Sequence, residues 1–422
     1  MTEPKGGGFD LRGLLRAVEA VAPVEAVDVL AVELARMVDA ADVSLLIANL
    51  SGDAAVRMSH VHVDGEARLV DRGNERLEPV PLDGSAYHQV LMTQTEHVER
   101  VDDGGWLVLV PVSERGDALG ILELTLPQSP DTETVEYLIA AAHALAYTLV
   151  ASRRHTDLFE TAQRDVPFSL PAEIQRRLLP PAYTVECAAF TLAGWLEPAA
   201  NVGGDTFDYA IDREYLYASI TDAMGHSVAA ALLATITVGS LRNTRRSGAS
   251  PVEQADAANT ALLEHAGLDQ FVTGHILRVR LADGGVDIVN AGHPLPLLLR
   301  GGVVSVAEVA GGPPLGVARS PYQAARLQLE PGDRLLLVTD GFLERNAVSL
   351  AIGDILESNA ARHPREVVRE LAENVLRATG GNLRDDATVL CLDWYGPDGD
   401  RDAPGGASID RATTRSTRPS GR

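Results

Sequence analysis

Apolar residues are spaced in two ways along this chain, and the spacing predicts where helices and strands alternate. Over 11–40 they recur at helical intervals with a break near Pro23, which predicts two helices. Alternating or apolar runs bounded by Gly and Asp then predict strands over 43–49, 56–63, 106–111 and 118–126. A long apolar stretch over 131–159 predicts a helix that closes this first region.

A second region, 181–395, is richer in strands. Apolar and alternating runs predict strands over 188–195, 206–211, 215–220, 274–281, 286–290, 295–300, 334–338 and 388–392. Helical spacing predicts helices over 228–243, 251–265 and 364–378. Many strands with helices in long insertions are typical of stacked sheets covered by helices, so we predict an α+β layered sandwich.

These patterns divide the chain into four segments. We predict a first domain over 9–155, a helical linker over 156–180 and a second domain over 181–395. The linker carries an amphipathic helix near Leu170, with Pro171 in its first turn. Residues 396–422 are mostly Gly, Pro, Asp, Arg, Ser and Thr, offer almost nothing to bury, and are predicted to be disordered.

Charge and cysteine content exclude several classes of partner. The formal net charge of −23 argues against nucleic acid and against an anionic membrane surface. Cys187 and Cys391 have neither metal-site nor disulfide spacing, which fits a reducing compartment. The N-terminus has no signal-peptide pattern, and the apolar stretch 135–151 contains Glu136, so a packed helix is favoured over a membrane span. We expect a cytoplasmic protein.

Four short segments each place an aspartate at the edge of an apolar run. The aspartates are Asp205, Asp222, Asp340 and the pair Asp385 and Asp386. Carboxylates brought together repel and raise one another's pKa, so their convergence requires cations. Hard divalent cations prefer oxygen ligands. The pattern predicts metal-assisted hydrolysis.

Six motifs give this region a family resemblance. They are Val-Gly-Gly-Asp-Thr-Phe-Asp-Tyr at 202–209, Asp-Ala-Met-Gly-His-Ser-Val-Ala-Ala-Ala-Leu-Leu at 222–233, Asn-Ala-Gly-His-Pro-Leu-Pro at 290–296, Gly-Pro-Pro-Leu-Gly at 312–316, Thr-Asp-Gly-Phe-Leu-Glu at 339–344 and Asp-Asp-Ala-Thr-Val at 385–389. With Leu-Leu-Pro-Pro at 178–181, this succession resembles the stage II sporulation protein E and sigma-regulator (RsbU-like) phosphatases. These are the bacterial branch of the metal-dependent PP2C (PPM) serine/threonine phosphatases. The resemblance covers about residues 170–394.

The resemblance implies an αββα sandwich with two Mn²⁺ or Mg²⁺ ions at one end of its sheets. The implied ligands are Asp205, Asp222, the backbone carbonyl of Ala223, Asp340 and Asp385. Asp222 is implied as the bridge between the ions, and Asp386 is the less certain ligand. Asp205 and Asp222 are the implied catalytic residues, acting through the ions.

The activity implied by the family is hydrolysis of a phosphoserine or phosphothreonine. Two cations roughly 4 Å apart lower the pKa of a shared water and screen the phosphate charge, so no protein nucleophile is needed. The implied substrate is a phosphorylated STAS-type anti-sigma-factor antagonist in a partner-switching pathway, carried on a separate chain.

The chain departs from the family pattern at Ala223 and Ser227, where the family often has Gly. An alanine at 223 requires a negative φ. No arginine is identifiable as a phosphate clamp. His226, His293 and Asn290 match family positions and are expected to be structural hydrogen-bonding residues.

The first domain, 9–155, resembles a GAF sensor domain, chiefly in the strand pair 107–112 and 118–124. Both a small-molecule ligand and a role in dimerisation alone remain open, and we expect a homodimer. Because the helix predicted over 131–159 leads towards the helix at 170–179, rearrangement of the sensor is expected to reposition that second helix against the metal site.

Two other functions remain open. Gly225-His226-Ser227-Val228-Ala229 imitates the nucleophile elbow of a serine esterase, with Ser227 as the nucleophile. The histidine that such an enzyme needs after Asp340 would have to be His363, and Asp205 and Asp385 would have no role. The third possibility is a non-catalytic scaffold with a vestigial metal site.

Overall fold

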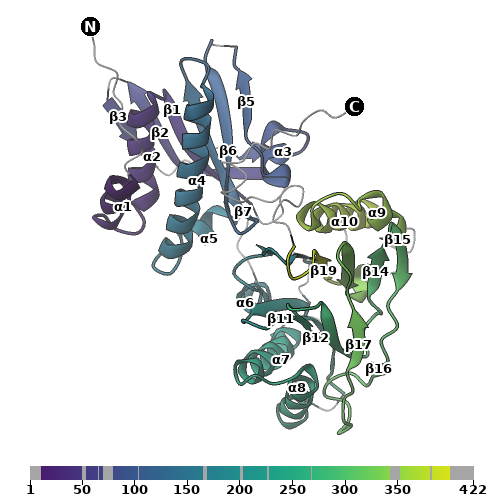
Figure 1. The fold of residues 1–422 in the computed structure, drawn as a ribbon. Coiled ribbons are helices and arrows are strands. Elements are labelled where there is room, and N and C mark those ends of the chain that lie inside the picture. The colour runs from purple at the N-terminus through teal and green to yellow at the C-terminus, as the bar shows by residue number, and fades with distance from the viewer. Residues whose placement is uncertain are drawn as a thin grey trace, which may run out of the picture. The chain divides into compact units, whose positions relative to one another are not determined.

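The chain divides into two compact units, Met1–Pro167 and Phe168–Pro404 (Figure 1). The computed structural model describes residues 11–49, 54–64, 66–69, 79–102, 104–164, 169–199, 203–225, 228–267, 269–342, 352–380 and 383–399. The domain boundaries set from the sequence remain predictions, and the proposed disordered segment lies almost entirely outside the described residues.

The first unit is an antiparallel sheet with helices on both faces. Its helices are α1 (Leu11–Glu19), α2 (Ala26–Val38), α3 (Ala86–Thr93), α4 (Thr132–Ser152) and α5 (Leu158–Ala162). Its strands are β1 (Asp42–Ala48), β2 (Ala54–Asp64), β3 (Glu66–Leu69), β4 (Val80–Pro81), β5 (His97–Arg100), β6 (Trp106–Glu114) and β7 (Asp117–Leu126). The strand order is β3-β2-β1-β7-β6-β5, with β4 beside β2.

Helices α2 and α4 cover one face of this sheet, and α3 covers the other. Leu34 and Leu145 lie in the core of the first face, and Leu91 lies in the smaller core under α3. Helix α4 is long and apolar enough to cross a membrane by composition, but Leu138, Leu145 and Leu149 are buried within the unit. This face of α4 packs into the core of the first unit. The GAF-like assignment stays a prediction.

The single helix predicted over 131–159 is two helices separated by a turn. Helix α4 ends at Ser152, and α5 begins at Leu158 after a cap in which Thr156 Oγ1 accepts from the Leu158 N–H at 3.2 Å. Phe159 is buried in the core of the first unit, with the Arg153 guanidinium stacked 3.8 Å from its ring centroid. Burying this ring requires the chain to turn back, and the apolar spacing did not reveal that turn.

The second unit contains two facing sheets. The first sheet contains β10 (Thr206–Ile211), β11 (Tyr215–Ala223), β12 (Val272–Arg280), β13 (Gly285–Ala291), β16 (Gly311–Gly312) and β17 (Ala325–Gln328). The second contains, in spatial order, β15 (Val303–Val306), β14 (Leu297–Arg300), β18 (Asp333–Val338), β19 (Ala387–Trp394), β9 (Phe190–Glu197) and β8 (Thr184–Glu186). Its helices are α6 (Leu170–Leu178), α7 (Val228–Arg246), α8 (Pro251–His265), α9 (Ile352–Ser358), α10 (Pro364–Thr379) and a short 3₁₀ turn, Asp340–Phe342.

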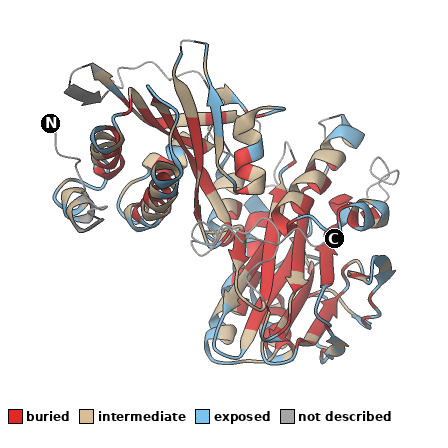
Figure 2. Cartoon of the chain, turned by 45° about the horizontal axis from the view of Figure 1, so that its top comes forward, coloured by how far each residue is buried: buried red, intermediate tan, exposed pale blue. Residues whose placement is uncertain are grey.

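Three apolar layers hold this unit together. Phe190, Phe207 and Trp394 fill the space between the sheets. Helices α7 and α8 pack on the first sheet, and α9 and α10 pack on the second. Figure 2 shows the strands of this unit mostly buried and the helices buried on one side. This αββα arrangement confirms the layered sandwich predicted from the sequence.

The two sheets approach closely at Gly194 in β9. A Cβ atom at this position would lie 2.5 Å from Cε2 of Phe207, which belongs to the facing sheet. Only a residue without a side chain therefore fits between β9 and the Phe207 ring.

We expect Gly194→Ala to destabilise the second unit by about 1–3 kcal/mol, because an added methyl overpacks a filled core. Gly239→Ala is the matched control, since Gly239 is exposed on α7 with no atom within 4 Å of an added Cβ. It should stabilise by about 0.5–1 kcal/mol through helix propensity. Urea unfolding followed by tryptophan fluorescence measures both, and equal effects would contradict the close approach.

Candidate metal centre

The segments that carry the aspartates meet at one end of the sandwich. Asp205 immediately precedes β10, and Asp222 lies near the end of β11, with Thr206 paired to Thr221 between them. In the facing sheet, Asp340 follows β18 and Asp385 precedes β19, which are paired strands. One sheet thus supplies two carboxylates, and the other supplies the remaining ones.

Three glycines show how closely these segments approach. A Cβ on Gly203 would lie 2.6 Å from Asp386 Oδ2 and 3.3 Å from Asp385 Oδ1. A Cβ on Gly204 would lie 2.6 Å from the carbonyl oxygen of Ala223. A Cβ on Gly341 would overlap the carbonyl oxygen of Asp386. The glycines of the Gly-Gly-Asp and Asp-Gly motifs are therefore needed for close packing.

Asp205 is the most enclosed of the aspartates, with 1% of its surface exposed. Its Oδ2 accepts hydrogen bonds from Thr339 Oγ1 and Thr388 Oγ1, each at 2.7 Å. Burial raises the pKa of this carboxyl group well above its usual value, and the charges of Asp222 and Asp386 raise it further. The two threonine hydroxyls act in the opposite direction.

Asp222 lies within β11, which is longer than the predicted strand and ends at Ala223. Burial raises the pKa of Asp222 to about 7, with further contributions from the carboxylates of Asp340 and Asp385. Ala223 is buried in extended structure and is not among the residues with positive φ, so its methyl group fits where the family often has Gly.

Asp340 and Asp385 complete the cluster at its outer edge. Asp340 is exposed at the start of the 3₁₀ turn, and Asp385 is partly buried. Asp385 Oδ1 accepts from the backbone N–H of Asp386 at 2.9 Å.

The Asp386 side chain is buried, and both of its oxygens accept hydrogen bonds. Its Oδ1 accepts from the Ala199 N–H at 2.8 Å, and its Oδ2 accepts from the Gly203 N–H at 3.2 Å and from Gln175 Nε2 at 2.5 Å. Burial raises the pKa of Asp386, and these hydrogen bonds lower it. Three donors thus hold the two oxygens of Asp386 to the surrounding backbone and to α6.

Gln175 is a site residue that the sequence patterns missed. It is the buried residue of α6, and its Nε2 also donates to the backbone carbonyl of Asp205 at 2.9 Å. The apolar residues Ile174 and Leu178 of the same helix are only partly buried. A glutamine inside an amphipathic helix was the available signal.

The residues of the other motifs form scaffolding. The Asn290 side chain accepts from the His293 N–H at 2.7 Å and donates to the His293 carbonyl at 3.1 Å. His293 Nδ1 lies 2.9 Å from Thr273 Oγ1, and burial lowers the pKa of His293 to about 3. Both residues are therefore structural, as expected. His226 and Ser227 lie outside the described residues.

The donor set has the chemistry that a divalent cation requires. Every candidate ligand atom is an oxygen, as Mg²⁺ and Mn²⁺ prefer. The packed glycines allow the segments that contain these oxygens to approach one another closely. Within the described ranges, no group of three or more Asp, Glu, His or Cys side chains is closed around one point. The carboxylates are thus within electrostatic reach of one another but do not form a finished coordination shell.

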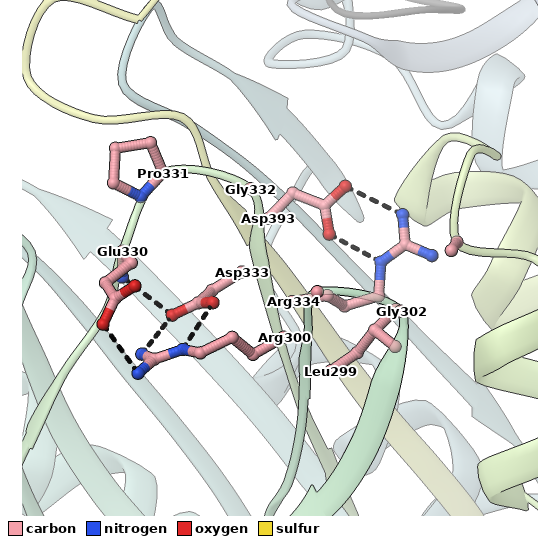
Figure 3. A pocket seen from close by; sticks show the side chains of 11 residues that line it. Leu299, Arg300, Gly302, Glu330, Pro331, Gly332, Asp333, Arg334 and Asp393 are labelled. Carbon is pink, nitrogen blue, oxygen red and sulfur yellow. Dashed lines mark hydrogen bonds and ion pairs between the residues drawn. The ribbon is translucent and has the colours of Figure 1, made fainter.

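A separate pocket lies at the opposite end of β18 (Figure 3). It has a volume of about 420 Å³ and contains two guanidinium groups. Arg300 binds Asp333 and Glu330, and Arg334 binds Asp393. These charges are paired with each other, so the pocket offers no free group for catalysis.

The αββα sandwich with carboxylates at one end is the arrangement that the resemblance to the PP2C phosphatases implied. Residues 212–395 match the family model for Stage II sporulation protein E (SpoIIE). The matched range includes Asp222, Asp340 and Asp385, and Asp205 precedes it.

Two curated relatives come from Bacillus subtilis (strain 168). Phosphoserine phosphatase RsbP is 28% identical over 184 residues, covering 42% of this chain and 44% of RsbP. Phosphoserine phosphatase RsbU is 23% identical over 234 residues, covering 53% of this chain and 68% of RsbU. The matched part thus spans less than half of RsbP. The solved RsbU and RsbW domains of a Mycobacterium tuberculosis protein match with 28% identity and a TM-score of 0.47, covering 51% of this chain and 63% of that chain.

We expect Asp222→Asn to stabilise the metal-free protein at pH 8. The folded-state pKa of about 7 lies above the usual unfolded value near 3.9. Ionised Asp222 therefore destabilises the folded state increasingly as the pH rises from about 4 to about 7, and the destabilisation is complete above about pH 7. In EDTA, Tm should rise by about 2–4 °C per kcal/mol relieved, and by less at pH 5.5.

Thermal unfolding with Mn²⁺ provides the second measurement. Mn²⁺ should raise the Tm of the wild-type protein and raise that of Asp222→Asn much less, because an ion that binds the folded state stabilises it. The control is Glu264→Gln, at an exposed carboxylate near the end of α8. It should change neither the Tm in EDTA nor the rise in Tm with Mn²⁺. A lower Tm for Asp222→Asn in EDTA would contradict this description of the cluster.

Proposed function

We propose that this protein is a metal-dependent phosphoserine/phosphothreonine protein phosphatase. The observation that carries the proposal is the meeting of Asp205, Asp222, Asp340 and Asp385 at one end of two facing sheets. Their mutual repulsion is relieved by cations, and the PP2C-type fold supports hydrolysis of a phosphoester.

Each residue of the centre has a proposed role. Asp205 and Asp222 hold the ions from one sheet, with Asp222 between them, and Asp340 and Asp385 hold them from the other. The Ala223 carbonyl contributes a neutral oxygen. When bound, two Mn²⁺ or Mg²⁺ ions supply charge neutralisation for the phosphate and lower the pKa of water. The carboxylates orient the centre and do not attack the phosphorus.

The proposed substrate is a phosphorylated STAS-type anti-sigma-factor antagonist in a partner-switching pathway. The similarity to the phosphoserine phosphatases RsbU and RsbP supports this substrate class. The substrate is a separate chain, and the net charge of −23 disfavours nucleic acid as a partner. A cytoplasmic location fits this assignment.

The first unit is the proposed regulator, a GAF-like domain whose input is either dimerisation or a small-molecule ligand. The contact that supports regulation is Gln175 in α6, which donates to both Asp205 and Asp386. Because α6 directly follows the first unit in sequence, displacement of α6 would remove donors from the metal centre. Exposed Tyr147 and Val150 on α4 are candidates for the dimer contact.

The non-catalytic scaffold remains the second candidate, because no three Asp, Glu, His or Cys side chains among the described residues are grouped closely enough to hold a metal ion. The esterase alternative depends on Ser227 and leaves the aspartate cluster without a role. Measuring phosphoester hydrolysis by the wild-type protein and its variants distinguishes these candidates.

With Mn²⁺, the full chain should hydrolyse p-nitrophenyl phosphate and dephosphorylate a phospho-STAS protein. Asp222→Asn should reduce both rates at least about 100-fold, because loss of the proposed shared ligand would weaken both phosphate charge neutralisation and water activation. Ser227→Ala should retain activity. Loss of activity in Ser227→Ala with retention in Asp222→Asn would favour the esterase, and no turnover of either substrate would favour the scaffold.

Gln175→Leu should lower activity at limiting Mn²⁺ by about 10-fold or more, because it removes the donors that fix Asp205 and Asp386. Arg177→Ala on the same helix is the control, since that side chain is exposed and pairs with Glu173, one turn earlier on α6. Initial rates across a Mn²⁺ titration measure the effect. Equal titration curves would exclude a role for α6 in metal binding.

A further inference from the structure

Asp205 is held from the facing sheet by two threonines. Asp205 stands at the start of β10 in one sheet, whereas Thr339 follows β18 and Thr388 lies in β19 of the other. Both hydroxyls lie 2.7 Å from the same oxygen, Oδ2. The two hydrogen bonds therefore cross between the sheets at the end where the carboxylates meet.

The backbone around Thr339 fixes the direction of the hydrogen bond between its hydroxyl and Asp205. The Thr339 N–H donates to the Thr388 carbonyl at 3.0 Å, and the Thr388 N–H donates to Thr339 Oγ1 at 2.9 Å. A hydroxyl has one proton to donate, and an ionised carboxylate only accepts. Thr339 therefore accepts from the backbone and directs its single proton to Asp205.

Two donors on one oxygen restrict rotation of the carboxylate about its Cβ–Cγ bond. Both threonines are fully buried, so water does not compete for these hydrogen bonds. With Oδ2 occupied, the other oxygen of Asp205 is the one left for an ion. A carboxylate that is already oriented loses less freedom when it binds a metal.

We propose that Thr339 and Thr388 are positioning residues that orient Asp205 for divalent-cation binding. This inference rests on the proposed metal dependence and adds two residues to it. Hydrogen-bonding partners of metal ligands typically contribute 10–100-fold to metal affinity or activity. The threonines act through Asp205 and do not touch the substrate in this scheme.

The same sandwich contains a matched control pair. Thr206 and Thr221 are also buried, lie opposite each other in β10 and β11, and share a hydroxyl–hydroxyl contact of 2.6 Å. They neighbour Asp205 and Asp222 in sequence, but their hydroxyls hydrogen-bond to each other. Thr206→Val/Thr221→Val therefore removes two buried hydroxyls without removing a donor to Asp205.

Isothermal titration of the full chain with Mn²⁺ tests the proposal. Thr339→Val/Thr388→Val should weaken Mn²⁺ binding by about 10–100-fold. Thr339→Ser/Thr388→Ser keeps the donors and should bind close to wild type, as should the control double variant. The Mn²⁺ concentration for half-maximal hydrolysis of p-nitrophenyl phosphate should rise by the same factor as the dissociation constant.

The outcomes are separable. Wild-type affinity in the double valine variant, or equal weakening in the control, overturns the positioning role and leaves the proposed phosphatase function intact. A wild-type protein that binds no Mn²⁺ overturns both. If the double valine variant does not fold, the single variants Thr339→Val and Thr388→Val each remove one donor, and unchanged affinity in both overturns the proposal.

Discussion

The second unit depends on holding several carboxylates together against their own repulsion. Asp205 and Asp386 receive hydrogen bonds from hydroxyl, amide and backbone donors, which offset part of the cost of burial. Asp222 is less compensated, and its pKa of about 7 reflects burial beside Asp340 and Asp385. This residual destabilisation gives a divalent cation a large gain on binding. The fold thus concentrates negative charge at the place where a cation would relieve it.

The carboxylates of the candidate centre come from both sheets. Asp205 and Asp222 belong to the sheet of β10–β13, and Asp340 and Asp385 adjoin β18 and β19 in the other. An ion bound by both pairs would link the sheets at one end, while Phe190, Phe207 and Trp394 hold them together between their faces. Small changes in sheet spacing would therefore alter metal binding, which makes the close packing at Gly194 relevant to the site as well as to stability.

The sequence predicted the elements whose signals are local. The helix over 251–265 is present with those bounds, because Ser250 and Glu253 form a capping box and Pro251 occupies the first turn. The strand over 206–211 is likewise present as predicted. The aspartate segments were recognisable because each interrupts an apolar run beside glycine.

The features that were missed depend on partners far away in sequence. Gln175 is buried because it meets Asp386, 211 positions along the chain, and no local pattern reports such a contact. The turn between α4 and α5 depends on the burial of Phe159 in the core of the first unit. Asp385 and Asp386 are adjacent residues of the same type, so the sequence does not distinguish them. The structure does, because Asp386 accepts hydrogen bonds from Ala199, Gly203 and Gln175.

Helix α6 is attached to the second unit at two points, and this gives it a direct effect on the site. Gln175 donates to the Asp205 carbonyl and to Asp386, while the carbonyl of Leu178 accepts from Arg242 of α7. Arg242 also binds Asp208 in β10, the strand that begins after Asp205. Moving α6 would leave the Asp386 oxygen with one donor fewer and would remove one of the two acceptors of Arg242 Nη2, which would still donate to Asp208. Because both attachments lead to β10, the position of α6 is coupled physically to the orientation of Asp205.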